Sequence, residues 1–242
     1  MTYLAAAEQV GDWLLSTTDR SADGWCWPVQ PGVSSEVDPG LGWGTAAPTL
    51  FFVEAYRTTG DERWLTAAQE GSRWMSAHLD ATIDGWTGCD LYIGGCGLYT
   101  GVGGWAVVLD ELAEAAGDDQ ARTLAGRVLE AVAGRATTVD SGAHWHNMTE
   151  IMWGTAGIGC VMLTLGAECL GPSAVDLAVR AGDWLVHDDL VGVERLAAAC
   201  RPSRPDERDP GAHGAGFLGQ RRQVLRIGRR CGVLPRLAPP RG

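Results

Sequence analysis

Apolar residues gather in three segments that each begin and end with a glycine. The segments run over 44–60, 101–117 and 154–171, and their leading glycines are 57 and 53 residues apart. The trailing glycine follows the leading one by 16, 16 and 17 residues. Apolar positions are nearly continuous inside each segment, which is typical of a helix buried on most sides. The trailing glycine suits a helix C-terminus, where a left-handed residue is needed. The pattern therefore predicts three buried helices.

A second, amphipathic helix is predicted after each buried one. Asp61 and Asp118 directly follow a trailing glycine and stand where an N-cap is needed. A further helix is predicted over 3–16, and the stretch 19–42, which contains several Gly, Pro and Ser residues, is predicted to be a loop. The three amphipathic ranges are 62–79, 118–134 and 173–187.

A repeat of about 55 residues with two helices is compatible with few architectures. The buried helices must pack against one another, and the amphipathic helices must shield them from water. This gives either an open solenoid or a closed double ring, and the strongly apolar first helices favour the ring. The predicted fold class is all-α, an incomplete α/α toroid of the 6-hairpin-like kind, with residues 1–200 as the repeat domain.

The composition changes after residue 200. All 19 basic residues are arginines, and ten of them lie in the last 42 positions, so that 201–242 carries a formal charge of +7 and 1–200 a charge of −18. Prolines interrupt the same stretch. It is predicted to be a disordered basic tail, or else the product of a frameshifted or truncated gene.

Charge and composition exclude several classes of protein. The net charge of −11 disfavours nucleic acid as a partner. The sequence contains no run of 18 apolar residues, so no membrane span is indicated. The first residues lack the basic region of a secretory signal. Seven scattered cysteines do not suggest a disulfide framework. We therefore expect a cytoplasmic protein.

Three motifs resemble the lanthionine synthetase C-like family, the cyclases of lanthipeptide biosynthesis. GLYTGVGGWAVVLDEL at 97–112 and WGTAGIG at 153–159 are similar to its glycine-rich repeats, and GDERWLTAAQEGSRWM at 60–75 is similar to the outer helix that follows. The resemblance covers roughly residues 3–195.

The resemblance implies a double ring of helices with zinc at one end. In the family, zinc holds a substrate cysteine as a thiolate, which adds to a dehydrated serine or threonine and closes a thioether ring. The implied partner is a precursor peptide that contains dehydrated residues and a free cysteine. A separate dehydratase would prepare it.

The sequence departs from the family at the metal ligands. The family draws them from a Trp-Cys-x-Gly turn and a Cys-His-Gly turn. Here Trp153 is followed directly by Gly154, no Cys-His-Gly occurs, and Cys26 precedes no glycine helix start. No zinc ligand can be assigned, which puts cyclase activity in doubt.

Two family positions outside the metal site have counterparts here. Glu150 stands four residues before Gly154, and His213 stands directly before Gly214. The resemblance implies that both are catalytic.

Other residue patterns leave alternatives open. His144 and His146 alternate in an extended stretch and could face the same way, as two metal ligands would, but packing of the loop is the favoured interpretation. A carbohydrate-processing enzyme of similar architecture would use aromatic platforms and paired carboxylates. A non-catalytic peptide-binding module or a degenerate fragment is a third possibility. The residues that suggest the carbohydrate enzyme are Trp25, Trp27, Trp86, Asp84 and Asp90.

Overall fold

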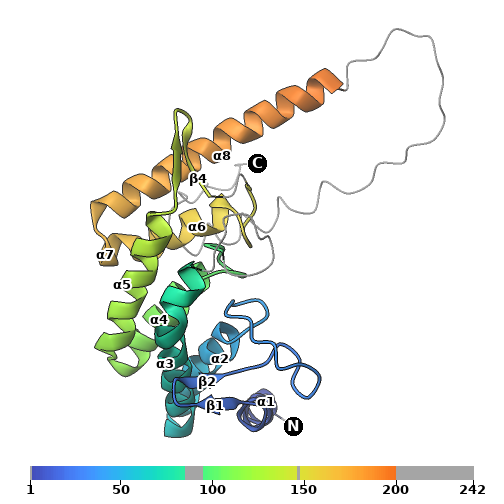
Figure 1. Cartoon of the computed structure of the whole chain (residues 1–242), viewed down its shortest axis with the longest axis vertical. Helices are drawn as coiled ribbons and strands as arrows, with labels where there is room; N and C mark the ends of the chain where they lie inside the picture. Colours follow the sequence, from blue (N-terminus) through green and yellow to red (C-terminus); the bar gives the residue numbers. More distant parts are fainter. Residues whose placement is uncertain (1, 85–94, 146–147, 200–242) are drawn as a thin grey trace, which may run out of the picture. The chain divides into compact units, whose positions relative to one another are not determined.

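The computed structural model describes residues 2–84, 95–145 and 148–199. Contacts between residues divide the chain into two compact units, Met1–Val193 and Glu194–Gly242. The first unit contains three helices that we call inner, each followed by an outer helix (Figure 1). This is the all-α architecture that the sequence predicts, an incomplete α/α toroid.

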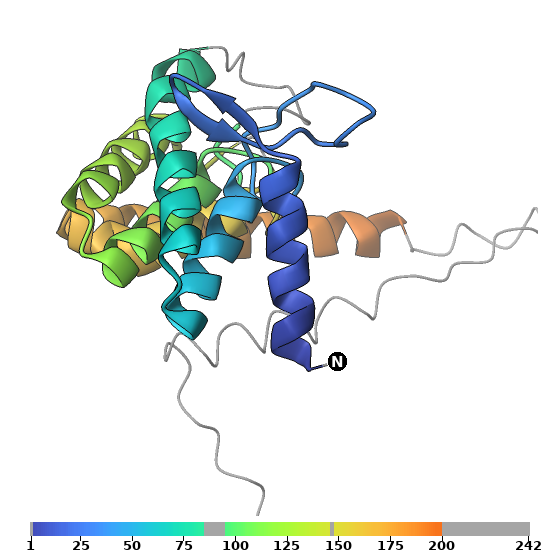
Figure 2. The ribbon, with the colours of Figure 1, turned by 90° about the horizontal axis from the view of Figure 1, so that it is seen from below.

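The predicted inner and outer helices are confirmed. Outer helix α1 precedes the first pair, and Figure 2 shows it in dark blue beside α2. The inner helices are α2 (Ala46–Thr59), α4 (Gly103–Ala116) and a third made of α6 (Thr155–Val161), the π-helix η1 (Met162–Gly166) and α7 (Ala167–Cys169). The outer helices are α1 (Tyr3–Ser16), α3 (Glu62–Asp84), α5 (Asp119–Ala133) and α8 (Pro172–Ala199).

The π-helix explains why the third repeat is one residue longer than the others. Its trailing glycine comes 17 residues after the leading one, rather than 16. A π-helical turn takes one more residue than an α-helical turn, so Met162–Gly166 absorbs the insertion within the helix. The helix still ends at the equivalent place, because Gly171 has a φ of 73° and its counterpart Gly60 a φ of 69°.

Helix starts follow the predicted capping. The Asp118 carboxylate accepts the backbone N–H groups of Gln120 and Ala121 at 2.9 and 3.0 Å. Asp61 accepts the N–H of Arg63 at 3.0 Å. Each cap satisfies donors that the first helical turn leaves without a partner, which fixes where the outer helix begins.

The turn before each inner helix, which we call a corner, explains the leading glycines. The corners are residues 38–44, 95–101 and 148–154. In each, the residue after the glycine donates its N–H to the carbonyl at the start of the corner, as Val102 does to Gly95 at 2.9 Å. A Cβ atom at Gly101 would lie 1.7 Å from the Gly95 carbonyl oxygen. Only glycine permits this approach of backbone to backbone.

Two short β-hairpins lie in regions that the sequence pattern assigns to loops, so the prediction of a plain loop over 19–42 is wrong. Strands of three residues are too short to show an alternating pattern. Each hairpin brings a glycine with positive φ against an outer helix, and a Cβ at Gly24 would lie 2.5 Å from the Glu70 carbonyl oxygen. The strands are β1 (Asp19–Ser21) with β2 (Gly24–Cys26), and β3 (Thr137–Val139) with β4 (Gly142–His144).

The residues that follow the two hairpins make the same hydrogen bonds, which shows which positions of the repeats are equivalent. Trp27 donates its backbone N–H to Thr45 Oγ1, and Trp145 does the same to Thr155 Oγ1. Their indole Nε1 atoms donate to carbonyls of the preceding outer helix, Leu14 and Val132 respectively. Trp145 therefore corresponds to Trp27.

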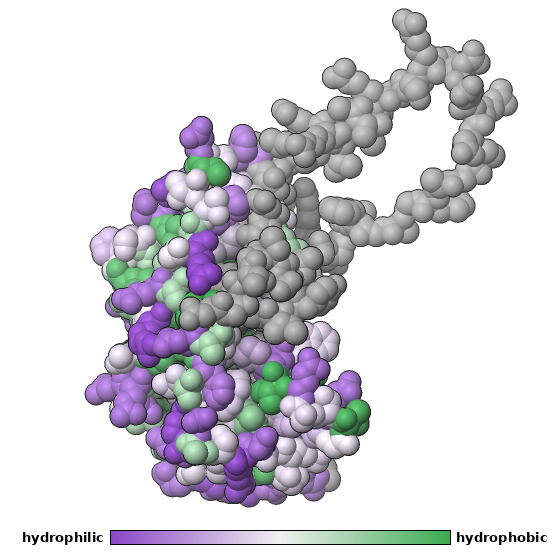
Figure 3. Space-filling view, viewed as in Figure 1, coloured by the Kyte–Doolittle hydropathy of each residue, from purple (hydrophilic) through white to green (hydrophobic). Residues whose placement is uncertain are grey.

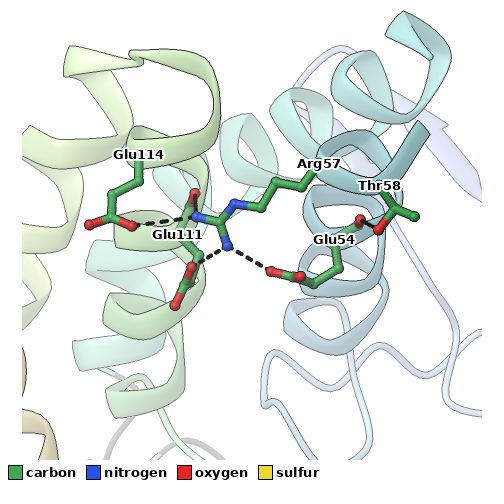
Figure 4. A network of polar contacts seen from close by, with 5 residues as sticks. All are labelled: Glu54, Arg57, Thr58, Glu111 and Glu114. Atoms are coloured by element: carbon green, nitrogen blue, oxygen red, sulfur yellow. Dashed lines mark hydrogen bonds and ion pairs between the residues drawn. The ribbon is translucent and has the colours of Figure 1, made fainter. Parts of the chain in front are cut away.

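A cluster of charged residues joins two inner helices near their C-terminal ends (Figure 4). Arg57 of α2 contacts Glu54 on its own helix at 2.7 Å. It also pairs with Glu111 of α4, and its Nη2 donates to the Glu111 carbonyl at 3.0 Å. Glu114 Oε2 lies 3.5 Å from Arg57 Nη2. One guanidinium thus bridges α2 and α4 through several contacts.

Replacing Arg57 with methionine is expected to lower the free energy of unfolding by about 1 kcal/mol, since a partly exposed network contributes more than a single surface pair. The loss should shrink in about 1 M salt, which screens surface charges. Urea unfolding at low and high salt measures both. Arg73→Met is the matched control, because Arg73 contacts Glu70 within α3, and it should cost less. Equal losses for the two variants would show that Arg57 does not join the helices.

None of the helices in the described part of the chain combines the length and the apolar character that crossing a bilayer requires.

Candidate functional site

Backbone hydrogen bonds join the three corners edge to edge. The Gly42 N–H donates to the Tyr99 carbonyl at 2.7 Å, and the Tyr99 N–H donates to the Met152 carbonyl at 2.9 Å. All three residues stand two positions before a leading glycine. The N-terminal ends of α2, α4 and α6 therefore meet at one continuous rim, built from segments far apart in the sequence.

Glu150 lies at this rim, in the third corner. Its carboxylate accepts the backbone N–H of Met152 at 2.6 Å and that of Trp153 at 2.5 Å, one on each oxygen. Met152 is the residue whose carbonyl receives the bond from Tyr99. In this conformation Glu150 holds the third corner in shape, and its predicted catalytic role stays a prediction.

Several predicted site residues lie outside the described residues. His213, the second predicted catalytic residue, is one of them, and so is the tail 201–242 with its predicted disorder or altered reading frame. The others are His146, Trp86, Asp90 and the side chain of Asp84.

Asp38 is a corner carboxylate that the sequence analysis missed. Its side chain is 8% exposed, and Oδ1 accepts the Gly40 N–H at 2.6 Å. Burial raises the pKa of this carboxyl, the hydrogen bond from Gly40 lowers it, and the charge of Glu36 raises it further. A signal was present in the sequence, since Asp38 stands six residues before Gly44, but only the folded corner shows that the carboxyl is buried.

The raised pKa of Asp38 predicts a specific pH dependence. A carboxyl with a raised pKa in the folded state binds its proton more tightly there, so its contribution to stability is lost as pH rises through the folded pKa. Asp38→Asn keeps an oxygen for the Gly40 N–H and removes the charge. Between pH about 4 and 7, wild-type stability should therefore fall relative to the variant. Denaturant unfolding across this range tests the prediction. If the free energy of unfolding of the wild type rises relative to that of the variant as pH rises, the prediction is contradicted.

The described cysteines and histidines do not come together as a zinc site. Among the described residues, no group of three or more Cys, His, Asp or Glu side chains is placed to hold a metal ion. Cys26 is buried in β2, and Cys96 is fully buried beside the Val132 carbonyl. Burial raises the pKa of both thiols. The residues described here do not fit the zinc that the motifs imply.

His144 is part of the packing between β4 and α8. Its side chain is buried, and its ring centroid lies 4.8 Å from that of Trp184. Trp184 corresponds to Trp74, which meets the other hairpin in the same way at Gly24. The contact with Trp184 favours loop packing over metal binding for His144.

Of the tryptophans that suggest a carbohydrate enzyme, Trp25 and Trp27 lie in the described residues and contact other side chains. Trp27 is 2% exposed and stacks obliquely on Phe52, with ring centroids 5.6 Å apart, so it belongs to the core. The guanidinium of Arg20 lies 4.2 Å from the centroid of the half-buried Trp25 ring. Trp27 therefore offers no exposed ring face for a sugar, because its ring is covered by other side chains.

The segment that builds the rim matches the model of a known protein family. A family model described as lanthionine synthetase C-like protein matches residues 35–210, which include all three corners. No curated protein matches the chain closely enough to count as a relative. The match covers more than half of the chain and begins just before the first corner. The chain therefore belongs to the lanthionine synthetase C-like family.

Proposed function

We propose that this chain acts on peptides in the formation of thioether rings. The observation that carries the proposal is the family match over the segment that builds the rim. Three inner helices begin there side by side, with Glu150 and Asp38 among the corner residues. A rim made of several chain segments presents a wide surface, which suits a peptide better than a small metabolite.

The reaction requires little beyond orientation and proton handling. The peptide cysteine loses its thiol proton, its sulfur bonds to the β-carbon of a dehydrated residue, the carbon–carbon double bond becomes single, and a proton is returned to the α-carbon, so that no atom is gained or lost. In our proposal the rim binds and orients the peptide. Glu150 acts through Met152 and Trp153, whose backbone it holds, and His213 handles the proton as the family resemblance predicts.

A thiol assay on the full chain tests the proposal. Ring closure leaves the mass unchanged, so we would follow the fraction of a peptide's cysteine that a maleimide can still alkylate, using a peptide that contains one cysteine and one dehydroalanine. With zinc supplied, the protein should speed the loss of alkylatable thiol over the uncatalysed reaction. His213→Ala should slow it, and the exposed His187 serves as the control through His187→Ala. Equal rates with and without protein would overturn a cyclase.

A second candidate is a peptide-binding protein without cyclase activity. The absence of a metal-binding group among the described residues favours it. Zinc content, measured on the same sample, separates the two functions. Stoichiometric zinc with thiol loss supports the cyclase, whereas peptide binding without either supports the second candidate.

A further inference from the structure

Three large apolar side chains are exposed at the rim, one from each corner. Trp43 is 64% exposed, and Tyr99 and Met152 are each 38% exposed. We call these three residues the corner row. Most large apolar side chains of the inner helices are covered, as in the case of Trp105, which is fully buried with its Nε1 donating to the Pro39 carbonyl. Exposed side chains of this kind, one from each of three adjacent segments, are typical of binding surfaces.

The backbone fixes the spacing of the corner row. Gly42, the neighbour of Trp43, donates its N–H to the Tyr99 carbonyl, and Tyr99 donates its N–H to the Met152 carbonyl, so the three turns lie side by side. Backbones joined by such hydrogen bonds are about 4.8 Å apart, so the distance from Gly42 through Tyr99 to Met152 is roughly 10 Å. An extended peptide rises about 3.3 Å per residue, so about three residues span the row.

The charged residues of the corner segments are all acidic. The segments 36–44, 95–102 and 148–154 contain Glu36, Asp38 and Glu150 and no basic residue. Glu36 is exposed, and its charge reaches Asp38. The first 200 residues as a whole carry a charge of −18. Figure 3 shows polar side chains over much of the described surface in view, with apolar ones scattered among them.

We propose that the corner row binds a short extended peptide segment that is both apolar and cationic. The apolar side chains of the segment contact Trp43, Tyr99 and Met152, and its arginine or lysine side chains face the acidic segment 36–44, where Glu36 is exposed. This inference rests on the proposed function, because it names the chemistry of the peptide that the rim takes.

Binding of labelled peptides to the full chain tests the inference. The probe is a fluorescein-labelled peptide of alternating leucine and arginine, and its matched control has glutamate in place of arginine. Fluorescence anisotropy should show binding of the cationic peptide and much weaker binding of the acidic one. Equal binding of the two peptides, or binding of neither, would overturn the inference.

Variants locate the binding. Trp43→Ala and Tyr99→Ala should each weaken binding of the cationic peptide about tenfold, as loss of a buried aromatic contact does. Tyr3→Ala is the matched control, since Tyr3 is fully exposed on α1 and outside the corner row, and it should leave the affinity unchanged. Circular dichroism would confirm that each variant is folded. Unchanged affinity in both corner-row variants would overturn the inference.

Two further measurements test the contribution of charge to peptide binding and the alternative that the corner row pairs two copies of the chain. Glu36→Gln should weaken binding of the cationic peptide a few-fold at low salt and reduce its salt dependence. Sedimentation shows whether the corner row instead pairs two copies of the chain. Self-association that Trp43→Ala abolishes, without peptide binding, would overturn the inference. If the cationic peptide binds but no thiol is lost, the inference about the corner row stands and the proposed cyclase function is overturned. If thiol is lost but the cationic peptide is not preferred, the cyclase function stands and the inference is overturned.

Discussion

Replacing Gly101 with alanine is expected to destabilise the protein by at least about 4 kcal/mol, or to prevent folding. The new Cβ would lie 1.7 Å from the Gly95 carbonyl oxygen. The backbone fixes the position of the Cβ, and the oxygen is itself a backbone atom, so no side-chain rotation can relieve the contact. The corner would have to open, and the hydrogen bond from Val102 to Gly95 would be lost with it.

Gly126→Ala provides the matched control for this prediction. Gly126 lies inside α5, and a Cβ there meets nothing within 4 Å. Alanine favours a helix over glycine by about 1 kcal/mol, so this variant should be more stable than the wild type. Urea unfolding followed by circular dichroism compares the two. If Gly101→Ala unfolds at the wild-type urea concentration, the close approach in the corner does not explain the leading glycine.

Replacing Trp145 with alanine is expected to lower the free energy of unfolding by about 3–5 kcal/mol. Its indole is 1% exposed, and Nε1 donates to the Val132 carbonyl at 2.9 Å. The substitution therefore opens a cavity and removes one hydrogen bond to the Val132 carbonyl, which still accepts the Arg135 N–H at 3.2 Å. It also removes the contact that ties the end of β4 to α5.

Trp13→Ala is the matched control for Trp145→Ala. Trp13 is 54% exposed on α1, so its removal should change the free energy of unfolding by no more than about 0.5 kcal/mol. The midpoint of thermal unfolding gives a second measure of both variants. A Trp145→Ala protein as stable as Trp13→Ala would mean that the third repeat does not pack as described.

The helices were predictable because their sequence signals are local. Runs of apolar residues, trailing glycines such as Gly60 and capping residues such as Asp118 act within one helix or one turn. The ring-like order followed from the repeat itself. Even the inserted residue of the third repeat was visible as a spacing of 17, although only the structure shows that a π-helix takes it up.

The corner row and the hairpins were not predictable because they depend on contacts between distant segments. Nothing local distinguishes the exposed Trp43 from the buried Trp27, since each stands in a glycine- and proline-rich stretch. The burial of Asp38 likewise depends on how the first corner folds back on itself. Glu150 was found by resemblance, but its contacts with Met152 and Trp153 required the folded turn.

Hydrogen exchange on the full chain tests most directly whether peptides bind at the rim. Adding the leucine–arginine peptide should slow exchange of backbone amides in the corners 38–44, 95–101 and 148–154. Exchange at the opposite ends of the inner helices, around Gly60 and Gly117, should be unchanged. Protection confined to those opposite ends, or no protection at the corners under conditions in which the peptide binds, would contradict the account.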